Sequence, residues 1–166
     1  MKRIGLLSDT HGFIDDKIYD FLKKCDEVWH AGDIGNITTA DQLSRLKNFK
    51  AVYGNIDGHD VRIVYPKLQT FRCEEVNVLM VHIGGYPGKY EKEIKSLIHD
   101  LSPDLFISGH SHILKVMYDK KNELLHINPG AAGKSGLHKH QTAVRFIIDG
   151  KDIKDLEIFE KKRSTH

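Results

Sequence analysis

The stretch Ile4-Gly5-Leu6-Leu7-Ser8-Asp9-Thr10-His11 joins a short apolar run to two side chains that commonly bind metal ions. A short, continuous apolar run that stops at polar residues is typical of a strand buried on both faces of a sheet. Ligands of open α/β sheets bind beyond the carboxyl ends of the strands. The sequence therefore predicts that Asp9 and His11 lie at a ligand-binding edge of a sheet.

Four further apolar runs end in the same way, at Gly32-Asp33, Gly54-Asn55, His82 and Gly109-His110-Ser111-His112. If each run is a strand of one sheet, all of these polar ends meet at one edge. The set contains no thiolate, which argues against a structural zinc site and favours Mn²⁺, Fe²⁺ or Zn²⁺ in a catalytic site. The seven candidate metal ligands are Asp9, His11, Asp33, Asn55, His82, His110 and His112.

Each candidate ligand also has an ordinary structural explanation. A single histidine at a strand end is more often a hydrogen-bonded polar residue than a ligand, and Gly32-Asp33 and Gly54-Asn55 are common turn pairs. Unrelated turns do not explain why all five strand ends carry coordinating side chains. The joint pattern therefore favours two metal ions, with the two carboxylate oxygens of Asp33 able to contact both.

Composition predicts a single domain. The chain has 166 residues, enough for one hydrophobic core, which we assign to residues 1–160, followed by a basic tail at 161–166. The net charge is only +2, so no stable nucleic-acid complex is expected. Cys25 and Cys73 lack metal or redox spacing and are typical of a reducing compartment. We therefore expect a cytoplasmic protein that is not bound to a membrane.

The pattern of elements predicts an α/β fold. Helices are expected from Asp15 or Asp16 to Lys24 and over 39–46 and 90–101. Further strands are expected at 49–53, 69–73 and 76–82, followed by two hairpins that pair 115–119 with 124–128 and 143–148 with 153–159. We expect two mixed sheets packed face to face and flanked by helices, in a four-layer α/β/β/α sandwich.

The ordered series Asp-x-His, Gly-Asp, Gly-Asn-x-Asp, His and Gly-His-x-His resembles the signature of the calcineurin-like metallophosphoesterases. The resemblance runs from Ile4 to about Gly133 and is strongest to the small single-domain phosphodiesterases of bacteria and archaea, near which the eukaryotic retromer subunit of the same fold belongs. It implies that one ion binds Asp9, His11, Asp33 and His112, and that the other binds Asp33, Asn55, His82 and His110, with Asp33 as the bridging ligand.

The resemblance implies a dinuclear enzyme that hydrolyses phosphodiesters by in-line attack of a metal-bridging hydroxide. We expect two divalent ions, with Mn²⁺ favoured over Fe²⁺, Zn²⁺, Ni²⁺ and Mg²⁺, and a small phosphodiester as substrate. A homodimer or tetramer is expected on family grounds. Two alternatives stay open at this point: a weak or inactive protein-binding scaffold like the retromer subunit, and a mononuclear iron or zinc enzyme.

One position departs from the family pattern. Many relatives carry a histidine after the asparagine, where this chain has Ile56, a side chain that neither donates a proton nor binds an anion. His59 is the candidate substitute as general acid, although an exposed loop histidine is the more common finding. Asp57 is expected to orient a ligand histidine, and His30 is a weaker candidate for a similar supporting role.

Two loops are candidates for shaping substrate choice. Residues 82–90 leave a predicted ligand and are rich in glycine, and residues 128–133 resemble the Asn-Pro-Gly loop of the family. The second loop is followed by Lys134, His138, Lys139 and His140, which we interpret as a turn with an exposed cationic edge.

Overall fold

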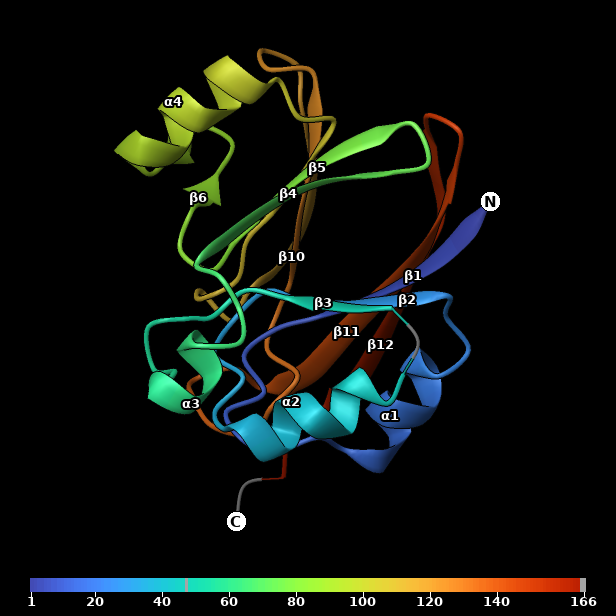
Figure 1. Ribbon diagram of the computed structural model, residues 1–166. Helices are drawn as coiled ribbons and strands as arrows, with labels where there is room; N and C mark the ends of the chain where they lie inside the picture. Colours follow the sequence, from blue (N-terminus) through green and yellow to red (C-terminus); the bar gives the residue numbers. More distant parts are fainter. Residues whose placement is uncertain (47, 165–166) are drawn as a thin grey trace.

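Two five-stranded mixed sheets lie face to face in the computed structural model, which describes residues 1–46 and 48–164 (Figure 1). In the first sheet, β1, β2 and β3 are parallel neighbours, and the long β11–β12 hairpin joins antiparallel at the edge of β1. Its strands are β1 (Lys2–Leu7), β2 (Glu27–His30), β3 (Phe49–Ala51), β11 (His140–Asp149) and β12 (Asp152–Lys162).

The second sheet has the order β4-β5-β8-β10-β9. Its three central strands β5, β8 and β10 run parallel, and β4 and β9 pair antiparallel at the two edges. The strands are β4 (Leu68–Cys73), β5 (Val76–Val81), β8 (Leu105–Ile107), β9 (Leu114–Asp119) and β10 (Leu124–Pro129). The helices are α1 (Asp16–Leu22), α2 (Ile37–Ser44), α3 (His59–Arg62) and α4 (Lys92–Leu101).

Strand β1 shows why the apolar runs are continuous. Ile4 and Leu6 belong to the core between the two sheets, and Leu7 packs on the opposite face with residues of α1 and α2. Because successive side chains of a strand point to opposite faces, a strand covered on both faces needs apolar residues at every position. On the far side, α4 packs Ile94 and Ile98 onto the second sheet. The predicted four-layer sandwich is confirmed.

Most element boundaries follow the predicted caps. Asp15 caps α1 by accepting a hydrogen bond from the Lys17 amide at 2.8 Å. Helix α2 begins at Ile37, two residues before the predicted start, because Asn36 caps it through the Thr39 amide. Helix α3 and the small hairpin of β6 (Gly85–Tyr86) and β7 (Lys89–Tyr90) were not predicted.

The basic C-terminal segment is only partly a tail. Strand β12 extends to Lys162, and Lys161 Nζ lies 2.6 Å from Asp15 Oδ2, so the first two residues of the predicted tail belong to the sheet. Thr165 and His166, which the prediction also placed in the tail, lie outside the described residues. Among the helices of the described chain, none has the length and apolar character needed to cross a membrane.

Candidate metal centre

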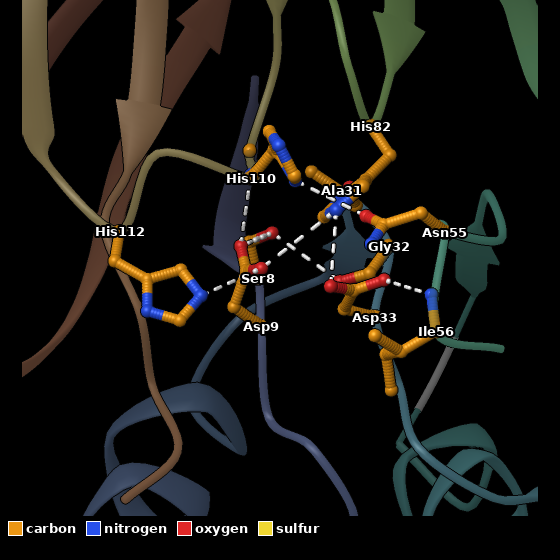
Figure 2. A network of polar contacts seen from close by, with 12 residues as sticks. Ser8, Asp9, Ala31, Gly32, Asp33, Asn55, Ile56, His82, His110 and His112 are labelled. Atoms are coloured by element: carbon orange, nitrogen blue, oxygen red, sulfur yellow. Dashed lines mark hydrogen bonds and ion pairs between the residues drawn. The ribbon is translucent and has the colours of Figure 1, made fainter. Parts of the chain in front are cut away.

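The predicted ligands meet at one end of the sandwich, and both sheets supply them (Figure 2). The first sheet contributes residues that follow β1, β2 and β3, and the second sheet contributes residues that follow β5 and β8. The expectation of a single sheet edge was therefore wrong. Each sheet contains a set of parallel strands instead, and the two sheets stack so that the carboxyl ends of both sets lie side by side.

The ligand atoms form two clusters, within each of which they lie no more than 4.8 Å apart. In the first cluster, His112 Nε2 lies 3.2 Å and His11 Nε2 lies 3.8 Å from Asp9 Oδ1. The second cluster contains Asp33, His82 and His110. Asn55 adjoins it, because Asn55 Oδ1 lies 3.1 Å from His110 Nδ1. The structure therefore brings all seven predicted ligands together.

Asp33, a member of the second cluster, also lies close to the first. Its Oδ2 atom is 3.5 Å from His11 Nε2 in the first cluster and 3.2 Å from His82 Nε2 in the second. Its Oδ1 atom accepts a hydrogen bond from the Ile56 amide at 3.0 Å. Ile56 therefore orients the central carboxylate through its backbone, although its side chain supplies no proton.

Unpartnered polar atoms test whether these residues fit metal ions. Within the described structure, Asp9 Oδ1, His11 Nε2 and His82 Nε2 are buried without a hydrogen-bond partner. His82 Nδ1 lies 2.8 Å from the Ala31 carbonyl and donates its proton there, so that in the neutral, metal-binding form of the ring the lone pair is on Nε2 and faces the carboxylates. Buried polar atoms are normally satisfied. Cations placed between these atoms would satisfy them, so the residues fit divalent metals.

The backbone around the centre is strained. Five of the seven candidate ligands adopt a left-handed backbone with φ between 47° and 72°: Asp9, His11, Asp33, His110 and His112. A non-glycine residue in this region costs about 1–3 kcal/mol and is concentrated at functional sites. The left-handed turns point these side chains inward from the strand ends. The fold maintains this arrangement at a cost in stability, as expected for a site retained for its chemistry.

Two glycines leave room for the carboxylates. A Cβ atom at Gly54 would overlap Asp33 Oδ1, and a Cβ atom at Gly109 would overlap Ser8 Oγ and lie 3.0 Å from Asp9 Oδ2. Ser8 Oγ in turn donates a hydrogen bond to Asp9 Oδ2 at 2.6 Å. Glycine at these positions therefore allows the backbone to approach the carboxylates closely.

The carboxylates remain ionised despite their burial. Burial alone would raise the pKa of Asp9, but the imidazoles of His11 and His112 outweigh it and hold the pKa far below its usual range. For Asp33, burial is likewise outweighed, chiefly by His82, so that its pKa is also lowered. Ionised carboxylates next to imidazole nitrogens are the donor set that borderline divalent metals prefer.

His30 supports the centre in its neutral form. The Gly32 amide donates to His30 Nδ1 at 3.1 Å, so the imidazole proton is on Nε2, which lies 3.0 Å from Thr10 Oγ1. Burial lowers the pKa of His30 to about 4. This neutral ring joins the two loops that carry Asp9 and Asp33.

Asp57 and His59 differ from expectation. The hydrogen bonds of Asp57 within the described chain run to the amides of Ile34, Gly35 and Gly54 at 2.8–3.1 Å, so it holds two ligand loops together and does not orient a histidine. His59 begins α3 with an exposed side chain and belongs to neither cluster. The role of His59 as a general acid remains a prediction, and its position outside both clusters argues against that role.

His138 is a supporting residue that sequence reasoning missed. It was assigned to an exposed cationic edge, but its Nδ1 atom lies 3.2 Å from Nδ1 of His112. The loop that carries it is attached to the end of the chain, because the Arg163 guanidinium donates to the carbonyls of Lys134 and Gly136. His138 lies far from the Gly-His-x-His motif in the sequence, and no sequence pattern indicated that it would contact His112.

The fold and the two clusters of candidate ligands are those expected of a metallophosphoesterase. The chain belongs to the calcineurin-like phosphoesterase superfamily, whose domain matches residues 1–151. A probable metallophosphoesterase of Methanothermobacter thermautotrophicus is 29% identical over 160 residues, covering 93% of this chain and 90% of the relative. The resemblance inferred from the motifs is therefore confirmed.

Solved structures show the same fold. The zinc complex of Vps29 from Entamoeba histolytica has a TM-score of 0.75 at 16% identity and matches 96% of this chain and 98% of its own. An archaeal phosphodiesterase has a TM-score of 0.73 at 21% identity and matches 95% of this chain and 99% of its own. At these identities the likeness establishes the architecture, and the reaction has to be argued from the site.

Proposed function

We propose that this protein is a dinuclear metal-dependent phosphodiesterase. The observation that carries the proposal is the position of Asp33 Oδ2, within 3.5 Å of one imidazole from each ligand cluster. A carboxylate in this position is suited to bridging two cations. The first ion would be held by Asp9, His11, Asp33 and His112, and the second by Asp33, Asn55, His82 and His110.

The residues of the centre prepare it for an anionic ester. When bound, two divalent ions supply Lewis-acid activation of water and neutralise charge at the phosphoryl group. Asp9 and Asp33 provide only two negative charges, and Asn55 contributes a neutral oxygen. The loaded centre therefore keeps a positive charge that attracts phosphate. His82 and Asp33 are held from outside by the Ala31 carbonyl and the Ile56 amide, so they need little reorganisation.

The side chain of Ile56 affects which leaving groups the centre can accept. Its side chain is 45% exposed and lies next to Asn55, where it offers no proton to a leaving group. General acid catalysis is typically worth about 10²–10⁴-fold. We therefore propose small phosphodiesters whose leaving groups need little protonation as the best substrates, with Mn²⁺ as the preferred metal.

The direct test is to compare hydrolysis of matched phosphomonoesters and phosphodiesters by the manganese-loaded protein, alongside Asp33→Asn. We expect diesters to be hydrolysed faster than monoesters. Asp33→Asn should lose metal, and its activity should fall by more than the loss of about 10–100-fold that is typical when a ligand's supporting partner is removed. Asp60→Asn, at an exposed carboxylate outside both clusters, is the control.

Two results would contradict the proposal. One ion per chain, with unchanged affinity after Asn55→Ala, would indicate a mononuclear site. Full metal occupancy with no hydrolysis of any ester would instead favour the protein-binding scaffold.

A further inference from the structure

A cavity of about 710 Å³ adjoins the candidate metal centre. Asn55 and His82, two of the proposed ligands of the second ion, form part of its lining. Its volume lies within the range of about 300–1,000 Å³ typical of small-molecule sites. A molecule with its phosphate at the metals can therefore extend into this space without leaving the protein surface.

The cavity has an aliphatic wall. Five branched apolar side chains line it, four from β4, β5 and α4 and one from the loop after β5: Leu68, Val81, Ile94, Leu97 and Ile83. Val81 and His82 both line the cavity, so this wall adjoins the centre. The outer part of the wall remains partly exposed at Leu68 and Leu97. Aliphatic side chains form no hydrogen bonds, so the wall favours an apolar group over a sugar or a polar chain.

Charged side chains lie at the same cavity. Three cationic side chains, those of Arg62, Lys67 and Lys92, line it together with the carboxylates of Glu91 and Glu93. Arg62 is fixed, since its guanidinium donates to the carbonyls of Asn55 and Asp57 and stacks 4.5 Å from the Tyr53 ring. The excess of cations next to an apolar wall suits an amphiphilic anion.

We propose that this cavity, named here the aliphatic groove, binds an apolar alkyl or aryl substituent of the phosphoester. The inference rests on the proposed function, because it places the phosphate at the metal pair. The substrate class that follows is a phosphodiester in which one substituent is hydrophobic. Binding comes from burial of that substituent against Leu68, Val81, Ile94 and Leu97.

Alkylphosphonates test the groove without turnover, because their carbon–phosphorus bond resists hydrolysis. Binding of methylphosphonate and hexylphosphonate to the manganese-loaded protein is measured by calorimetry. A fully buried methylene strengthens binding about fourfold. For a groove that is open on one side, we expect hexylphosphonate to bind at least about tenfold more tightly than methylphosphonate. Phenylphosphonate forms a third arm, which distinguishes a flat aryl group from a flexible chain.

Variants on α4 locate the effect. Leu97→Asn should remove most of the preference for hexylphosphonate and leave methylphosphonate binding unchanged. Leu101→Asn is the matched control, because Leu101 lies on the same helix, is 46% exposed and does not line the groove. Leu68→Thr on β4 tests the same wall independently, should Leu97→Asn fail to fold.

The possible outcomes separate the two proposals. Equal binding of methylphosphonate and hexylphosphonate would overturn the groove and leave the phosphodiesterase proposal intact. A preference for hexylphosphonate that survives both Leu97→Asn and Leu68→Thr would also overturn the groove. Failure of every phosphonate to bind the metal-loaded protein would overturn the proposed function and the groove with it.

Discussion

His138 orients the imidazole of His112 through a hydrogen bond between their Nδ1 atoms, which lie 3.2 Å apart. His138 Nε2 lies 2.7 Å from the Gly133 carbonyl, which can only accept, so the proton of His138 is on Nε2. Its Nδ1 atom then accepts the proton of His112 Nδ1. In the neutral, metal-binding form of the ring, the lone pair of His112 is on Nε2, which faces Asp9 Oδ1 at 3.2 Å.

Replacing His138 should weaken metal binding without removing a ligand. His138→Phe keeps a ring but loses the acceptor, so that His112 becomes free to rotate. Loss of such an outer partner typically costs about 10–100-fold in metal affinity. Titration calorimetry with Mn²⁺ measures the effect. His140→Phe is the control, since His140 pairs with the exposed Glu160 instead. Equal affinities for the two variants would show that His138 does not act on the metal.

Gly54→Ala should disturb the bridging carboxylate through a single methyl group. The new Cβ atom would overlap the Asp33 amide nitrogen and Asp33 Oδ1, and the Ile56 amide holds Oδ1 in place. We expect reduced metal stoichiometry with little loss of overall structure. Gly58→Ala provides a matched comparison, because its Cβ atom would meet only Asp60 Oδ1, at 3.5 Å. Metal analysis after gel filtration would report the difference, and normal stoichiometry in Gly54→Ala would refute the predicted overlap.

Asp57→Asn should lower both stability and metal affinity. Asp57 is 3% exposed and accepts three hydrogen bonds from backbone amides, which the amide group of asparagine cannot fully replace. A hydrogen bond to a charged group contributes about 1.5–3 kcal/mol, so we expect a loss of about 2–3 kcal/mol in the free energy of unfolding. Urea denaturation measures it, with Asp41→Asn, at an exposed position of α2, as reference. A loss as small as that of the reference would contradict the assigned role.

His126 should contribute to acid instability. It is fully buried on β10, and burial lowers its pKa to about 4 from an ordinary value of 6.5. Below pH 6.5 the unfolded chain therefore binds a proton that the folded chain does not, so stability falls as the pH drops from 6.5 toward 4. The contribution of this residue reaches about 3 kcal/mol at the low end of that range.

The change in slope is measurable with His126→Asn. Asparagine can still donate a hydrogen bond to the Phe106 carbonyl, which His126 Nδ1 approaches at 3.1 Å, but it does not titrate. Urea denaturation at a series of pH values should show a shallower dependence for the variant between pH 4 and 6.5. Parallel curves would mean that His126 titrates normally in the folded protein.

The amino-acid sequence by itself indicated the strands of the two large sheets and the set of candidate ligands. Leu6 and Leu7 face opposite sides of β1, and only a strand covered on both sides requires apolar residues at both positions. Asp9 and His82 lie within two residues of the ends of β1 and β5, so their approximate places could be predicted from local pattern. The order of the motifs was enough to indicate the family, which the match over residues 1–151 established.

Tertiary structure alone decided what surrounds these ligands. His138 meets His112 across 26 positions of sequence, and Asp57 binds amides of a loop more than 20 positions away. The aliphatic groove likewise joins Leu68 to Leu97. Such contacts depend on which strands are neighbours and how two sheets stack. Local periodicity reports only which face of an element is apolar, so it carries no information about the partner that will cover that face.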